Sequence, residues 1–137
     1  MPSGYFLFFF SAAIGLFCSM LERIARTRLL ASLWLLVITI LFLLPGSALP
    51  KNDMIIPHFD KYVHFGFFAV LLFLWRIHLE PAIKYSFFLL LLGFVYGLGI
   101  EIIQHYLIAN RSFDMGDVLA DMAGAVVGVL AWWYIKK

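Results

Sequence analysis

Long apolar stretches with few interruptions dominate the chain, and they determine which elements we predict. Five of them reach or approach the roughly 20 apolar residues that an α-helix needs to cross a bilayer. They run over Gly4 to Leu21, Leu29 to Leu44, Tyr62 to Trp75, Tyr85 to Ile108 and Met115 to Ile135. None alternates apolar and polar residues as a membrane strand does. The pattern predicts an all-α, polytopic transmembrane helical bundle with four core spans and an extra N-terminal span.

The composition agrees with lipid as the solvent for these helices. Of the 137 residues, 64% are hydrophobic and only 13% are charged, whereas a soluble domain is about half apolar and about a quarter charged. A single soluble core of this length has too little interior for so many aromatic and aliphatic side chains. The net charge of +2 gives no indication of nucleic-acid binding. The single cysteine, Cys18, excludes an internal disulfide.

The leading stretch is separate from the other four in our interpretation. It lacks the basic residues that precede the core of a secretory signal, and no small-residue cleavage site follows it. It is either an additional span or upstream sequence, because Met20 offers a second start. We therefore divide the chain into residues 1–21, the N-terminal hydrophobic segment, and residues 22–137, the transmembrane domain.

The distribution of basic residues predicts the orientation of the spans. Alternating helices place seven of them on one side: Arg23, Arg26, Arg28, Arg76, Lys84, Lys136 and Lys137. The other side has three: Lys51, Lys61 and Arg111. By the positive-inside rule the first side is cytoplasmic. The residues Trp75, Trp132 and Trp133 near the predicted span ends are expected to anchor in the membrane interface.

The polar residues of the last three stretches are predicted to meet at the outer end of the bundle. Asp60 and His64 are four residues apart, so they share a helix face. Glu101 lies inside the fourth stretch, within two turns of its end. Charge near hydrocarbon is costly and needs a partner or a function. We therefore predict a ligand-binding site made of Asp60, Lys61, His64, Glu101, Gln104, Arg111, Asp114, Asp117 and Asp121.

Several roles stay open for individual residues of this site. His64 and Glu101 are the candidate catalytic acid and base, without an enzyme activity being assigned. Arg111 is the expected counter-charge of Glu101, or it binds a phosphate or carboxylate group beside a helix N-terminus. Asp114 or Asp117 is expected to cap the last helix. The acids and the histidine are residue types that bind divalent cations, but their spacing matches no recognised zinc pattern, so we assign no metal and no cofactor.

Glycines spaced four residues apart predict close helix packing. Gly93 and Gly97 lie in the fourth stretch, and Gly124 and Gly128 in the fifth. Small residues at this spacing let membrane helices approach closely. We expect these two helices to pack backbone to backbone and to hold their acidic ends together.

Taken together, these motifs resemble the VanZ-like family of small bacterial membrane proteins. The resemblance rests on the run Asp60 to Phe65, on Gly97-x-x-x-Glu101-x-x-Gln104, on the run Arg111 to Val118, and on Gly124-Ala125 with Gly128. It covers roughly Leu29 to Trp133. Many members of the family have Asn where this chain has Asp121, which adds a carboxylate here. The founding member is associated with resistance to the lipoglycopeptide antibiotic teicoplanin.

The resemblance and the polar cluster lead to two functional hypotheses. The first is a multi-pass protein of the bacterial inner (cytoplasmic) membrane that binds an amphipathic envelope lipid, a lipid-linked wall precursor or a teicoplanin-type lipoglycopeptide. Its partners are then membrane lipids and that ligand, with no nucleic acid. The second is an intramembrane enzyme that acts on a lipid or envelope substrate through a His/Glu/Asp site, with or without a metal.

Overall fold

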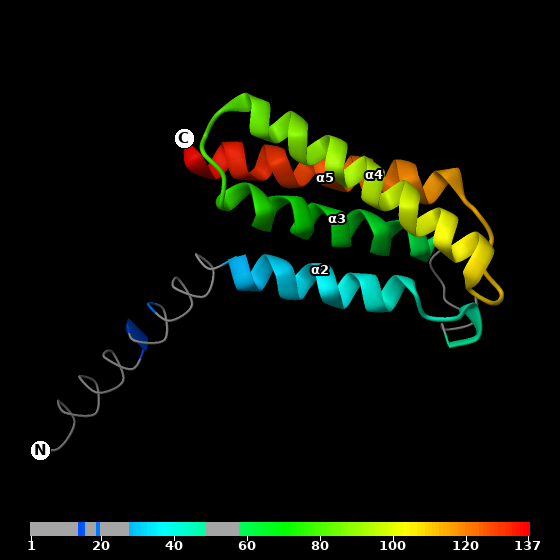
Figure 1. Ribbon diagram of the computed structural model, residues 1–137. Helices are drawn as coiled ribbons and strands as arrows, with labels where there is room; N and C mark the ends of the chain where they lie inside the picture. Colours follow the sequence, from blue (N-terminus) through cyan, green and yellow to red (C-terminus); the bar gives the residue numbers. More distant parts are fainter. Residues whose placement is uncertain (1–13, 16–18, 20–27, 49–57) are drawn as a thin grey trace, which may run out of the picture.

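The computed structural model describes residues 14–15, 19, 28–48 and 58–137 (Figure 1). In these ranges it contains the helices α2 (Arg28–Phe42), α3 (Phe59–Ile77), α4 (Ile83–Leu107) and α5 (Met115–Lys136), and the short 3-10 helix η1 (Gly46–Ala48). The leading stretch from Gly4 to Leu21 falls almost entirely outside the described residues. The described elements are all helical, which confirms the all-α part of the prediction.

Two of the four α-helices in the described ranges are long and apolar enough to cross a membrane. These are α4 with 25 residues and α5 with 22 residues. Helix α2 is apolar but has only 15 residues. Helix α3 has 19 residues and carries Asp60, Lys61 and Arg76 near its ends. A bundle of four spans therefore stays a prediction.

The most extensive helix contact joins α3 and α5, which run in the same direction (Figure 1). A Cβ atom added at Gly124 would overlap the carbonyl oxygen of Phe65, and one at Gly128 would overlap that of Ala69. The glycines therefore let the two backbones touch, as small residues do in membrane helix pairs. Our expectation that these glycines face the glycines of α4 was wrong.

Arg76 closes the end of the bundle where α3 turns into α4. Its side chain is completely buried. It donates hydrogen bonds to Ser86 Oγ at 2.9 Å and to three backbone carbonyl oxygens, those of Leu79, Glu80 and Ala82. Its guanidinium carbon lies 3.7 Å from the ring centroid of Trp132, a favourable cation–π position. The sequence predicts an interfacial position for Trp132, but its side chain and that of Arg76 are both buried.

Gly124→Ala is expected to lower the free energy of unfolding by about 2 kcal/mol or more, because the added methyl group forces two backbones apart. The matched control is Gly99→Ala in α4, where an added Cβ meets nothing within 4 Å. That change should be neutral or stabilising by up to ~1 kcal/mol, since alanine favours helices. Thermal unfolding of both variants in detergent tests this, and equal effects would contradict the assigned α3–α5 contact.

Arg76→Lys is expected to destabilise the protein by about 2–3 kcal/mol, because a lysine cannot replace the planar set of donors. The matched control is Lys84→Arg, which swaps the same residue types at an exposed position at the start of α4. Chemical unfolding followed by circular dichroism measures both changes. If Arg76→Lys were as stable as the control, the hydrogen bonds to the turn would contribute little.

Candidate functional site

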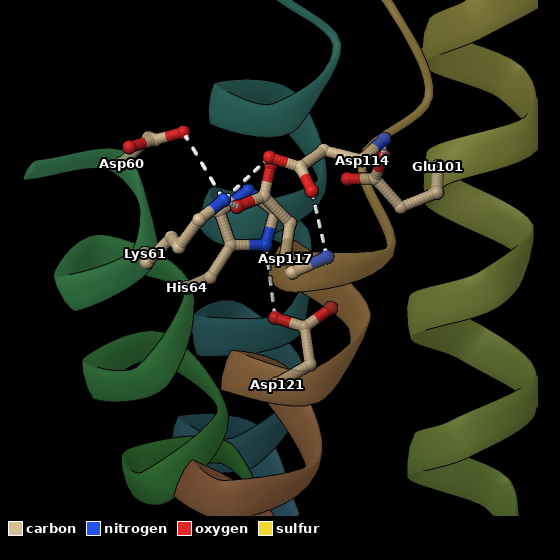
Figure 2. A network of polar contacts seen from close by, with 8 residues as sticks. Asp60, Lys61, His64, Glu101, Asp114, Asp117 and Asp121 are labelled. Carbon is tan, nitrogen blue, oxygen red and sulfur yellow. Dashed lines mark hydrogen bonds and ion pairs between the residues drawn. The ribbon is translucent and has the colours of Figure 1, made fainter. Parts of the chain in front are cut away.

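Polar side chains from three helices meet at the opposite end of the bundle (Figure 2). Lys61 and His64 come from the start of α3, and Glu101 comes from near the end of α4. The remaining members come from the start of α5 and the residue before it. We call this group the polar cluster and define it as Lys61, His64, Glu101, Asp114, Asp117 and Asp121. The prediction that these residues share one end of the bundle is correct.

Lys61 contributes an ammonium group to the cluster, and this group already forms ion pairs with carboxylates of the same chain. Its Nζ lies 2.9 Å from Asp117 Oδ1 and also donates a hydrogen bond to Asp114 Oδ2. Asp60 is exposed, and its carboxylate is farther from the same nitrogen, at 3.9 Å. It therefore lies at the edge of the cluster. Two of the three N–H donors of Lys61 are thus occupied, which reduces the capacity of Lys61 to bind an anionic ligand.

Asp114 links all three helices. It is the N-cap of α5, and its Oδ1 accepts a 2.7 Å hydrogen bond from the backbone N–H of Gly116, as we expected for Asp114 or Asp117. Its own backbone N–H donates to Glu101 Oε2 at 3.0 Å. The hydrogen bond from Lys61 and that from Gly116 lower the pKa of the Asp114 carboxyl. Asp114 therefore carries its charge at neutral pH.

His64 and Asp121 form a buried pair between α3 and α5. His64 Nδ1 lies 2.9 Å from Asp121 Oδ1, and both side chains are almost completely buried. The ring of Phe42 packs on the imidazole with centroids 4.5 Å apart. Gly97 of α4 leaves room for the carboxylate, since a Cβ there would lie 2.7 Å from Asp121 Oδ2. The hydrogen bond with Asp121 and the ring of Phe42 fix the position of the imidazole.

Glu101 is completely buried, and one of its oxygens has no hydrogen-bond partner among the described residues. Oε2 accepts the hydrogen bond from Asp114, whereas Oε1 accepts none. The expected ion pair with Arg111 is not formed; Arg111 is half-buried, and its Nε is buried without a hydrogen-bond partner. The backbone N–H at the start of α5 takes the place of Arg111 because the loop after α4 brings Asp114 directly onto Glu101.

Gln104 has a structural contact. It is buried, and its Nε2 donates a 2.8 Å hydrogen bond to the carbonyl oxygen of Phe42. That carbonyl lies at the C-terminal end of α2, where no helical N–H is available to it. Gln104 therefore ties α2 to α4 and lies beside the polar cluster without joining it.

Two groups of residues in the described part of the chain have the donor atoms for a metal ion. His64, Glu101 and Asp117 are buried, and each offers one ligand atom within 4.8 Å of the other two. Asp60, Asp114 and Asp117 form a second, more exposed group. Sequence spacing did not indicate the first group because its three members come from three different helices.

The comparison with protein families gives a match that covers nearly the whole chain. The model of the VanZ/LLP1 family matches residues 3–136. The chain belongs to the VanZ/LLP1 family. The VanZ/LLP1 match also includes the leading hydrophobic stretch, which lay outside the motifs that carry the resemblance. Searches of curated proteins and of solved structures gave no match.

Asp114→Asn is expected to reduce the dependence of stability on acid pH. Because the pKa of Asp114 in the folded state is below that of an ordinary aspartate, its stabilising effect is complete above the ordinary pKa and is lost as the pH falls through the folded-state pKa. Asn keeps the helix cap but loses the ion pair with Lys61, at a cost below ~1 kcal/mol for a half-exposed pair.

The free energy of unfolding, measured from pH 6 down to pH 3, should therefore decrease less steeply in Asp114→Asn than in the wild type. Asp60→Asn, which removes an exposed acid at the edge of the cluster, is the control and should follow the wild type. A wild-type slope in Asp114→Asn would show that other groups carry the acid sensitivity.

Proposed function

We propose that this VanZ/LLP1-family protein is a multi-pass protein of the bacterial inner membrane that binds an amphipathic envelope ligand at its polar end. The ligand's polar group would meet the polar cluster and Arg111, and its apolar part would lie in the surrounding lipid. The chemical classes that fit are an envelope lipid, a lipid-linked wall precursor and a teicoplanin-type lipoglycopeptide.

The observation that carries this proposal is a set of buried polar atoms without partners at one end of the bundle. Among the described residues they are Glu101 Oε1, Asp121 Oδ2 and Arg111 Nε, and a fourth such atom, His78 Nε2, lies at the opposite end. Each unsatisfied buried polar atom costs about 1–3 kcal/mol, and more for a charged group. A polar ligand group that enters this region would supply the missing hydrogen bonds. The unsatisfied atoms therefore favour a binding role over a purely structural one.

The apolar surface of the helices supports a membrane location. Leu91 and Val95 on α4 and Leu119 and Leu130 on α5 are each at least 59% exposed. Soluble monomers rarely expose large continuous apolar areas, whereas helix faces of this kind are solvated by lipid. A ligand with an acyl or polyprenyl chain could then reach the polar end from within the bilayer.

Arg111 is the residue we assign to an anionic group of the ligand. It lies in the loop directly before α5, close to the free N–H groups at that helix start. It forms no ion pair with a carboxylate in the described residues, whereas Lys61 contacts Asp114 and Asp117. A guanidinium binds phosphate or carboxylate by two parallel hydrogen bonds, and the helix N-terminus favours the same charge.

A second candidate function is an intramembrane enzyme that acts on a lipid or envelope substrate. The observation that favours it is the buried His64–Asp121 pair with Glu101 nearby. A carboxylate bonded to Nδ1 orients an imidazole for proton transfer at its other nitrogen. In this hypothesis His64 and Glu101 are the acid and base, and turnover of the bound lipid replaces simple binding.

Arg111→Gln is expected to weaken ligand binding by about tenfold or more, the equivalent of one charge-assisted hydrogen bond. Binding of teicoplanin, and separately of a polyprenyl phosphate, would be measured on the full chain in nanodiscs. Lys84→Gln, which removes a basic residue at the start of α4, is the control and should bind as the wild type does.

The same variants would be expressed in a deletion strain that is challenged with teicoplanin and other envelope stresses. Loss of the wild-type phenotype with Arg111→Gln, but not with Lys84→Gln, supports the proposal. Full function of both Arg111→Gln and Glu101→Gln would refute it. Chemical conversion of a bound lipid by the wild type, absent in His64→Gln, would favour the enzyme.

A further inference from the structure

We propose that the polar cluster binds a divalent transition-metal ion of the Zn²⁺ or Mn²⁺ type through His64, Glu101 and Asp117. This inference rests on the same site as the proposed function and names a cofactor for it. The three ligands come from α3, α4 and α5, so the ion would join the three helices at their polar end.

The distances between the three side chains suit a single ion. Their ligand atoms lie within 4.8 Å of one another, and all three residues are buried. Donor atoms bind Zn²⁺ at about 2.0–2.2 Å, so two donors of one ion are at most ~4.4 Å apart. Small rotations of these side chains would therefore bring them into coordination.

The second, independent observation is the unpartnered oxygen of Glu101. Glu101 is completely buried, Oε2 accepts the hydrogen bond from the N–H of Asp114, and Oε1 has no hydrogen-bond partner in residues 28–48 and 58–137. Figure 2 shows the Glu101 carboxyl group extending from α4 towards α5 and the rest of the cluster. A buried carboxylate oxygen without a donor is costly, and a cation bound between the helices would satisfy it.

The contact of His64 with Asp121 prepares the imidazole for a metal. Asp121 Oδ1 lies 2.9 Å from Nδ1, and Nε2 makes no hydrogen bond to any described residue. Metal-binding histidines commonly donate their other ring N–H to a carboxylate, which fixes the tautomer and the ring orientation. Asp121 would have this supporting role, and Nε2 would be the ligand.

The polar cluster, as defined above, has more carboxylates than basic side chains, so a cation would balance its charge. Lys61 forms ion pairs with Asp60, Asp114 and Asp117, whereas Glu101 and Asp121 have no ion pair with a lysine or arginine among the described residues (Figure 2). Asp117 uses only Oδ1 for Lys61, which leaves Oδ2 for an ion. A divalent cation would offset two of the remaining negative charges.

The donor set favours a transition metal over Ca²⁺ or Mg²⁺ because it includes an imidazole. The more exposed group of Asp60, Asp114 and Asp117 has only carboxylates and no buried atom without a partner. Three protein ligands also leave a coordination position open. A phosphate or carboxylate of the envelope ligand could occupy that position and so connect the ion to the proposed binding function.

The test uses the full chain, purified in detergent, stripped with a chelator and titrated with Zn²⁺ or Mn²⁺. Calorimetry and elemental analysis should show one ion per chain in the wild type. Glu101→Gln should weaken the affinity by about 100-fold or more, and Asp121→Asn by about 10–100-fold, as is usual for a carboxylate that supports a ligand. The exposed acids Asp60 and Glu80, changed to Asn and Gln, should leave it within twofold.

Glu101→Gln keeps the size and the hydrogen bond to Asp114, and its helical content and elution volume verify that it is folded. Absence of metal binding in the wild type, or equal affinity in Glu101→Gln, would overturn the inference, as would loss of the ion in Asp60→Asn alone. Binding of teicoplanin or a polyprenyl phosphate that is unchanged by the chelator would leave the proposed function intact and refute its metal. Metal binding without binding of teicoplanin or polyprenyl phosphate would support the metal site and refute the proposed function.

Discussion

The backbone contact between α3 and α5 determines the arrangement of the polar end. Gly124 lies on Phe65 and Gly128 on Ala69, which sets the relative register of two helices that run in the same direction. Because the helical rise is constant, this register also places Asp121 beside His64 and brings the first turn of α5 to Lys61. The glycines thus do no chemistry, yet the polar contacts between α3 and α5 exist only in the register that they set.

The approximate positions of the described helices, and the meeting of His64 with the acids at one end, followed from the sequence. Apolar length predicted helices over Tyr85 to Ile108 and Met115 to Ile135, close to α4 (Ile83–Leu107) and α5 (Met115–Lys136). The cap at Asp114 followed from residue type, because a short acid before an apolar run suits a helix start. Spacing by three and four residues gathered the acids on one face of each helix, so their meeting could be predicted from hairpin topology alone.

The partners of individual residues could not be predicted in the same way. A stripe of small residues indicates that another backbone comes close, but it does not identify that backbone. Gly124 was therefore assigned to the contact with α4, whereas it packs on α3. Counting charges paired Glu101 with Arg111, although a backbone N–H forms the hydrogen bond. The burial of Arg76 could have been predicted from the sequence. Steps of four residues from His64 lead through Phe68 and Leu72 to Arg76, and all four are buried in α3. Its carbonyl partners lie in a turn whose path the pattern does not determine.

The buried charged side chains at the two ends of the bundle differ in how completely they are hydrogen-bonded, and this difference is relevant to function. At one end Arg76 has a hydroxyl, three carbonyl oxygens and the ring of Trp132 as partners. At the other end Glu101 and Asp121 each have an oxygen without a hydrogen-bond partner in the described part of the chain. The same chain can therefore satisfy a buried ion with its own groups. The incomplete bonding of the polar end is then best explained by an ion or a ligand that completes it, because a structural role alone would not require the burial of two unsatisfied carboxylate oxygens.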